Sequence, residues 1–266
     1  MFPGAATDPD AADYVVVGAP LDASTTFEPG TRFGPGRVRH YAESFEDYDR
    51  RTDQRFTDLA VADHGDIGPT DDVADYLAFL RGTVRDYADD GTIPLLVGGE
   101  HTVSVAGVRA LDPDVFCCLD AHLDLREEYA GNPLSHATVT RHALDVADRA
   151  IVLGARSGCR SEWERASETD VTVVEPDAVT DWEPDFEDER VYCSLDIDAA
   201  DPGFAPGTGT KEPFGLTPRV LRDVVRAVAP HAVGFDVVEV NDRDDGQAAV
   251  LAGKLLRSFV FAHADS

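Results

Sequence analysis

The sequence predicts a single α/β domain with a mainly parallel sheet. Apolar, β-branched runs alternate with helical patterns along the whole chain, and such alternation gives parallel strands joined by right-handed crossovers. No linker, repeat or low-complexity tract divides the 266 residues. Acidic and imidazole side chains follow several of the strands, at the edge where open α/β sheets bind ligands.

The predicted strands are short apolar runs, at residues 14–18, 58–67, 93–97, 115–119, 150–153, 171–174, 191–197 and 232–238. Helical patterns lie between them, at 35–49, 73–87, from about 102, at 139–146 and 161–166, from 217, and at 247–262. Pro35 and Pro218 suit the first turn of a helix. Residues 1–12, rich in Ala, Asp and Pro, are expected to be a flexible N-terminus, which leaves 13–266 as the domain.

The chain is strongly acidic. Lys and Arg number 23 against 51 Asp and Glu, which gives a net charge of −28. Such a field repels nucleic acid and anionic membranes, so we expect neither as a partner. The acids are spread between apolar runs, which argues against disorder. With only two lysines, this pattern indicates adaptation to a high-salt cytoplasm, as in a halophilic archaeon.

The four cysteines lack the spacing of a metal site, and three of them fall in predicted buried strands, which indicates small core residues: Cys117, Cys118 and Cys193. No signal peptide and no apolar run long enough to cross a bilayer is visible. We therefore expect a cytoplasmic protein.

Four groups of polar side chains fall at strand ends. They are His101; Asp120, His122 and Asp124; Asp196 and Asp198; and Glu239. Taken singly, each has a simpler reading: a histidine after two glycines is more often a capping residue, and an Asp-x-His-x-Asp triplet can be a solvated strand end. Together they are hard to dismiss, because alternate residues share one face and buried unpaired carboxylates are costly.

The ligand types indicate a metal. Carboxylates and imidazoles without a thiolate favour manganese, with iron, cobalt or a zinc pair as alternatives. Six ligands suit two ions with shared carboxylates, and such a pair provides hydroxide at neutral pH. Metal-assisted hydrolysis of a carbon electrophile is the reaction class that this set predicts.

Three motifs resemble the signature blocks of the ureohydrolases, the arginase/agmatinase family. They are Gly98-Gly-Glu-His101, Asp120-Ala-His-Leu-Asp124 and Ser194-Leu-Asp-Ile-Asp-Ala-Ala-Asp-Pro202. The resemblance implies a three-layer α/β/α fold with an eight-stranded parallel sheet and two manganese ions per chain. One ion would be held by His101, Asp120, Asp124 and Asp196. The other would be held by Asp120, His122, Asp196 and Asp198, and a metal-bridging hydroxide would attack the guanidinium carbon.

Further roles follow only from the resemblance. His136 matches a histidine that shuttles protons, although alone it would be read as a surface residue. Glu239 matches a glutamate that pairs with the guanidinium, and Thr210 a threonine of the same pocket. The family commonly forms trimers or hexamers, so we expect a homo-oligomer.

The loop around residues 125–138 resembles the agmatinase form, so the expected reaction is hydrolysis of agmatine to putrescine and urea. Glu127 or Glu128 could bind the free amine, unless they are simply solvated surface. Lys211, Phe214 and Asp242 depart from the agmatinase pattern and leave the substrate open.

Arginase, guanidinobutyrase or another guanidino-acid hydrolase stays an alternative, with Arg126, Arg32 or Lys211 as partner of a substrate carboxylate. A deacetylase-like zinc enzyme and a non-catalytic relative are disfavoured, because all six ligands are present.

Overall fold

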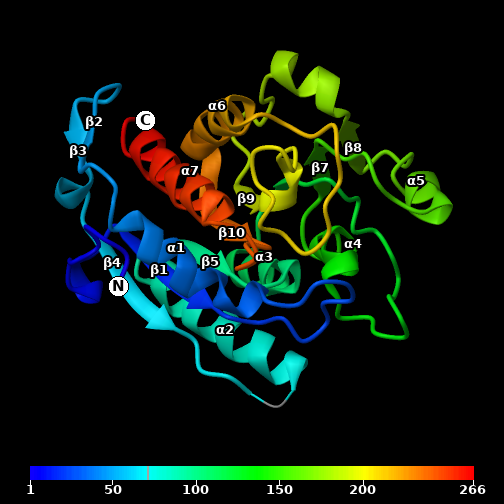
Figure 1. Cartoon of the computed structure of the whole chain (residues 1–266), viewed down its shortest axis with the longest axis horizontal. Coiled ribbons are helices and arrows are strands. Elements are labelled where there is room, and N and C mark those ends of the chain that lie inside the picture. The colour runs from blue at the N-terminus through cyan, green and yellow to red at the C-terminus, as the bar shows by residue number, and fades with distance from the viewer. Residues whose placement is uncertain (71) are drawn as a thin grey trace.

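The computed structural model describes residues 1–70 and 72–266 and has the predicted class: an eight-stranded sheet in which every strand pair is parallel (Figure 1). The strand order is β4-β1-β5-β10-β9-β6-β7-β8. The strands are β1 (Tyr14–Ala19), β4 (Val61–Asp66), β5 (Ile93–Gly98), β6 (Val115–Leu119), β7 (Arg149–Leu153), β8 (Val171–Val174), β9 (Val191–Asp196) and β10 (Ala232–Val238). All eight coincide with the predicted runs within a few residues.

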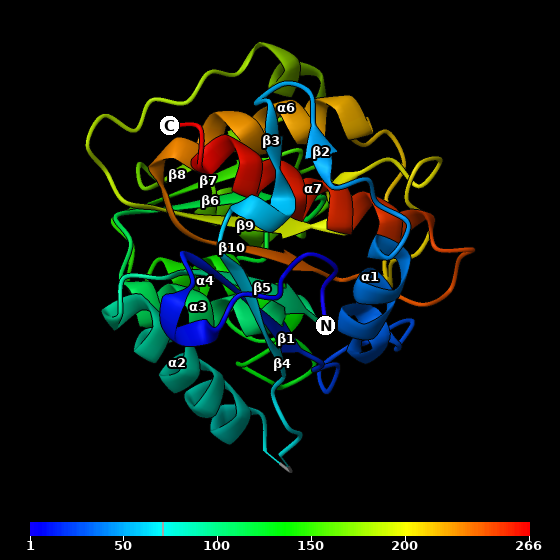
Figure 2. The same cartoon turned by 90° about the vertical axis from the view of Figure 1, so that its left-hand side faces the viewer.

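Helices cover both faces of this sheet, which makes the three layers (Figure 2). The helices are α1 (Gly34–Ala42), α2 (Val73–Asp89), α3 (Ser104–Leu111), α4 (Val139–Ala143), α5 (Arg160–Arg165), α6 (Pro218–Val228) and α7 (Gln247–His263). Apolar side chains of α1, α6 and α7 share one core with alternate strand residues, whereas those of α2, α3 and α4 share the core of the opposite face. The inner strands are therefore buried on both sides, which explains their nearly continuous apolar sequences, whereas the edge strands β4 and β8 are partly exposed.

The last strand lies in the middle of the sheet. Strand β10 pairs with β5 on one side and with β9 on the other. Together with β6, which pairs with β9, these strands are the four that carry the polar motifs at their carboxyl ends. The chain thus gathers motifs from residues 101 to 239 at one edge of the sheet.

One local prediction differs from the structure. The helix expected over 35–49 ends at Ala42, and Tyr48–Asp49 instead pairs with Gln54–Arg55 in a short antiparallel hairpin, β2 and β3. At the N-terminus, Phe2 is fully buried and its ring centroid lies 5.8 Å from that of Phe56. The flexibility expected of residues 1–12 stays a prediction about motion. Across residues 1–70 and 72–266, no helix is long and apolar enough to cross a membrane.

Candidate metal and substrate site

The polar residues predicted at the strand ends converge at the carboxyl edge of the four central strands. His101 opens a short 3-10 helix after β5, and Asp120 directly follows β6. Asp196 ends β9, and Glu239 directly follows β10. All four side chains are buried. The topology therefore brings together residues that are up to 138 positions apart.

One part of the cluster surrounds the Nδ1 atom of His101. This atom lies 2.9 Å from Oδ2 of Asp124, 3.1 Å from Oδ2 of Asp120 and 3.7 Å from Oδ2 of Asp196. It is buried, yet it has no partner with hydrogen-bond geometry. An imidazole nitrogen without a hydrogen bond, facing three carboxylates, has the arrangement of a metal ligand.

The second part surrounds Nδ1 of His122, which lies 3.0 Å from Oδ2 of Asp198 and 3.5 Å from Oδ1 of Asp120. Backbone amides fix these carboxylates: Oδ1 of Asp198 accepts from the N–H of Ala121 at 3.1 Å, and Oδ1 of Asp196 accepts from the N–H of Asp198 at 2.8 Å. Such bonds hold oxygens in place before any cation arrives. Asp120 takes part in both halves of the cluster.

The negative charge of the clustered carboxylates exceeds the positive charge of the side chains around them. Burial, and then the charges of Asp198 and Asp120, raise the pKa of Asp196 well above its usual value. Burial, followed by the charge of Asp120, raises the pKa of Asp124 to about 7. Burial alone would also raise the pKa of Asp120, but His101 and His122 lower it instead. Bound divalent cations would supply the missing positive charge, so these residues fit a metal site.

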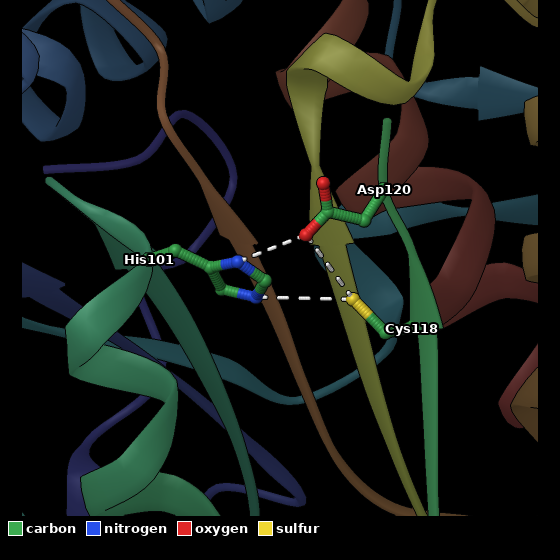
Figure 3. Close-up of side chains that lie close together, drawn as sticks. All are labelled: His101, Cys118 and Asp120. Atoms are coloured by element: carbon green, nitrogen blue, oxygen red, sulfur yellow. Dashed lines mark hydrogen bonds and ion pairs between the residues drawn. The ribbon is translucent and has the colours of Figure 1, made fainter. Parts of the chain in front are cut away.

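A thiol that the sequence analysis assigned to the core lies beside this cluster. Sγ of Cys118 is 3.8 Å from Nε2 of His101 and 3.9 Å from Oδ2 of Asp120 (Figure 3). Its position follows from β6, where it lies two residues before Asp120 on the same face. Burial raises its pKa well above the usual value, which keeps it a thiol.

Glu239 occupies a left-handed backbone conformation, with φ of 61°. Its Oε1 accepts a hydrogen bond of 2.8 Å from the backbone N–H of His101. Burial raises the pKa of Glu239 to about 8, against the effect of this hydrogen bond. A cationic group beside the second oxygen, Oε2, would favour the ionised form of the carboxylate.

His136 begins a short 3-10 helix, and its ring is held by hydroxyl groups. Nδ1 lies 3.3 Å from Oγ of Ser135 and 3.5 Å from Oγ of Ser24, and Nε2 lies 3.5 Å from Oγ1 of Thr26. Burial, and then the positive charges of His101 and His122, lower the pKa of His136 to about 4. The imidazole is therefore neutral at pH 7 and able to accept a proton.

Ser24 is itself held by Glu100, a contact that the sequence analysis missed. Oε2 of Glu100 accepts from the N–H of Ser24 at 2.7 Å, and Oε1 accepts from its hydroxyl at 2.9 Å. The hydroxyl of Ser24 in turn accepts a hydrogen bond of 3.1 Å from the N–H of His136. The place of Glu100 next to His101 was the only signal of this role in the sequence.

A cavity of about 470 Å³ opens onto the cluster. Most of the site residues expected from the sequence line its wall: His101, His122, Asp124, His136, Asp196, Asp198, Thr210 and Glu239. The wall also includes Arg126, which was considered as a partner of a substrate carboxylate. Three further wall residues had no expected role: Tyr129, Glu162 and Glu212. Asp120 is buried and is not among the residues of this wall. Glu127 is exposed and lies outside the described cavity lining, so the structure does not bring it to the site.

The chain is similar to known proteins over nearly its whole length. Residues 12–262 match the Arginase family. The agmatinase of Bacillus anthracis is 36% identical, with 94% of this chain and 91% of that protein covered. The guanidinobutyrase of Pseudomonas aeruginosa is 32% identical, with 93% and 85% covered.

Among solved structures, the agmatine ureohydrolase of Thermoplasma volcanium superposes with a TM-score of 0.94 at 33% identity, covering 99% of this chain and 94% of that one. The match in sequence and in fold agrees with the resemblance inferred from the three blocks. The chain belongs to the arginase family.

Proposed function

We propose that this protein is an agmatinase, which hydrolyses the guanidinium group of agmatine to urea and putrescine. The convergence of two histidines and four aspartates at one end of a cavity carries this proposal. The similar proteins named agmatinase and agmatine ureohydrolase support the choice within the family.

The site fits a pair of divalent ions, for which we propose manganese because the ligands are oxygen and imidazole nitrogen. His101, Asp120, Asp124 and Asp196 would hold one ion, and Asp120, His122, Asp196 and Asp198 the other. When bound, such a pair lowers the pKa of a coordinated water, so that a nucleophile is available at neutral pH. The orphaned Nδ1 of His101 supports this ligand set.

Glu239 is proposed to orient the guanidinium. Its Oε1 is fixed by the backbone of His101, which leaves Oε2 for the planar N–H donors of the substrate. A Cβ on Gly209 would lie 3.8 Å from this Oε2, so the backbone of Gly209 lies beside the second oxygen. Thr210 follows in the same loop and lines the cavity.

His136 is proposed to carry a proton to the leaving amine. Its lowered pKa keeps the ring neutral at pH 7, so a proton taken up during the reaction would be held only briefly and passed on readily. The hydroxyls of Ser24 and Thr26 hold both ring nitrogens near the cavity, where Tyr129 packs edge-on with ring centroids 5.6 Å apart.

The charges around the cavity favour a substrate with a cationic tail. The three cations considered as carboxylate partners are already paired: Arg32 with Asp22, Lys211 with Glu28, and Arg126 with Glu162. Glu212, by contrast, has one ionic neighbour among the described residues, Nε2 of His122 at 3.8 Å. Its carboxylate could bind the ammonium group of agmatine, the role first considered for Glu127.

Guanidinobutyrate is the second candidate substrate, because a relative named guanidinobutyrase is 32% identical. Arg126 would then have to share its guanidinium between the carboxylate of that substrate and Glu162, which also accepts hydrogen bonds from two backbone amides. We also propose that the protein forms a homo-oligomer, a trimer or hexamer, and that it works in a high-salt cytoplasm. Light scattering at high and low ionic strength tests the assembly.

The first experiment is urea release by the manganese-loaded protein in high salt, with agmatine, arginine and 4-guanidinobutyrate compared. The highest kcat/KM is expected for agmatine. A preference for either guanidino acid would contradict the role of Glu212, and no urea from any of the three would contradict the proposed function.

A further inference from the structure

We propose that a buried chain of hydrogen bonds from Tyr192 through Asp236 and Ser194 holds His101 in the orientation and tautomer that bind metal. The proposal rests on the metal site given above and concerns residues that do not face the cavity. These are positioning residues, because they act on the metal only through His101.

The chain crosses neighbouring strands on one face of the sheet. Oη of Tyr192 donates to Oδ2 of Asp236 at 2.7 Å, and Oγ of Ser194 donates to Oδ1 of Asp236 at 2.7 Å. Nε2 of His101 lies 3.1 Å from the same Oγ. Ser194 and Asp236 are direct partners in the register of β9 and β10. All four side chains are at most 1% exposed.

The direction of these bonds determines the tautomer of His101. The hydroxyl of Ser194 gives its proton to Asp236, so its oxygen can only accept from Nε2–H. In the neutral ring, the form that binds a metal, the remaining nitrogen Nδ1 then carries the lone pair. Nδ1 is the atom that faces the aspartates and has no hydrogen-bond partner. Hydrogen bonding at one ring nitrogen commonly prepares the other for a metal in this way.

The thiol of Cys118 does not replace this arrangement. Its Sγ lies 3.8 Å from Nε2 of His101, as Figure 3 shows, and a thiol sulfur is only a weak acceptor. Ser194 is the nearer and stronger partner.

The burial of Asp236 is hard to explain by stability alone. Among residues 1–70 and 72–266, no cationic side chain lies within 4.0 Å of its carboxylate, which depends on hydroxyl donors instead. A buried carboxylate without a cation is costly, and an apolar side chain would fill the space more cheaply. Helix α3 also makes room for the network, since a Cβ on Gly107 would lie 2.1 Å from Oη of Tyr192.

The test uses Ser194→Ala and Asp236→Asn in the full-length protein. Ser194→Ala removes the acceptor for Nε2–H, whereas Asp236→Asn keeps the size but replaces one acceptor oxygen by a donor. Cys193→Ala is the matched control, because Cys193 is equally buried on β9 but faces the opposite core. Manganese affinity is measured by competition with a chelator, stoichiometry by elemental analysis, and the Tm of each metal-free protein by calorimetry.

We expect both network variants to bind manganese about 10–100-fold more weakly, the usual cost of losing such an outer partner. Excess manganese should restore much of the kcat of Ser194→Ala, and Cys193→Ala should keep wild-type manganese affinity at a lower Tm. A fall in Tm with unchanged manganese affinity in both network variants would overturn the proposal and leave the agmatinase assignment intact. A wild-type protein that binds no divalent metal would overturn both.

Discussion

Replacement of Glu239 by glutamine tests the proposed recognition of the guanidinium. The backbone N–H of His101 requires an acceptor at the position of Oε1, 2.8 Å away. The amide oxygen of the glutamine must take this position, so its NH2 group replaces Oε2 and points at the substrate. The NH2 group of the glutamine then faces the N–H donors of the guanidinium, where the wild type offers a carboxylate oxygen.

The loss is that of a charge-assisted hydrogen bond plus an unsatisfied contact, about 2–4 kcal/mol. This corresponds to a roughly 30–1,000-fold fall in kcat/KM for agmatine. Urea release over a range of agmatine concentrations measures it, with bound manganese determined on the same samples. Glu127→Gln is the matched control, because it removes the same charge from an exposed loop position outside the cavity.

A kcat/KM of Glu239→Gln within threefold of wild type, at equal manganese content, would refute this account of guanidinium binding. An equal loss in Glu127→Gln would show instead that the substrate responds to the general field of the acidic surface.

Four further results are expected. Asp196→Ala should abolish urea release and lower bound manganese below two ions per chain; near wild-type turnover in the urea assay would contradict its shared role. His136→Asn should lower kcat with two ions retained. Because the pKa of His136 falls from 6.5 to about 4 on folding, the unfolded chain binds more protons between these values. The free energy of unfolding of the wild type should therefore be highest above pH 6.5 and fall by about 3 kcal/mol toward pH 4. Urea denaturation of the metal-free proteins should show a smaller fall in His136→Asn. Glu212→Gln should raise KM for agmatine about tenfold and leave that for guanidinobutyrate unchanged; equal changes would place the amine elsewhere.

The sequence predicted the strands and the polar residues that gather at their carboxyl ends, because both depend on local pattern. An apolar run followed by Asp120 and His122 identifies a strand and its carboxyl end without knowledge of its neighbours. Parallel pairing then aligns such ends whatever the strand order. The order itself, with β10 between β5 and β9, has no local signal.

The cavity wall was less predictable because it is built by loops. Glu212 and Glu127 both lie in polar loops, and nothing in their sequence neighbourhood shows which one faces the site. The contact of Ser24 with Glu100 and His136 joins three segments far apart in the chain. The alternation of β9 and β10 placed Ser194 and Asp236 in buried strands, but their pairing depends on the register between those strands.

The central place of β10 in the sheet has a consequence for the folding of the newly synthesised chain. Until residues 232–238 have been synthesised, the sheet consists of two separate halves, β4-β1-β5 and β9-β6-β7-β8. Each half then exposes an additional edge, on β5 or on β9, which β10 covers in the finished sheet and which offers unpaired backbone groups to other chains. Residues from both halves are needed for the cluster around His101, so the two halves must first be joined by a strand made nearly last. Folding through such distant pairings is slow, so a newly made chain stays prone to aggregate until β10 has paired with both halves.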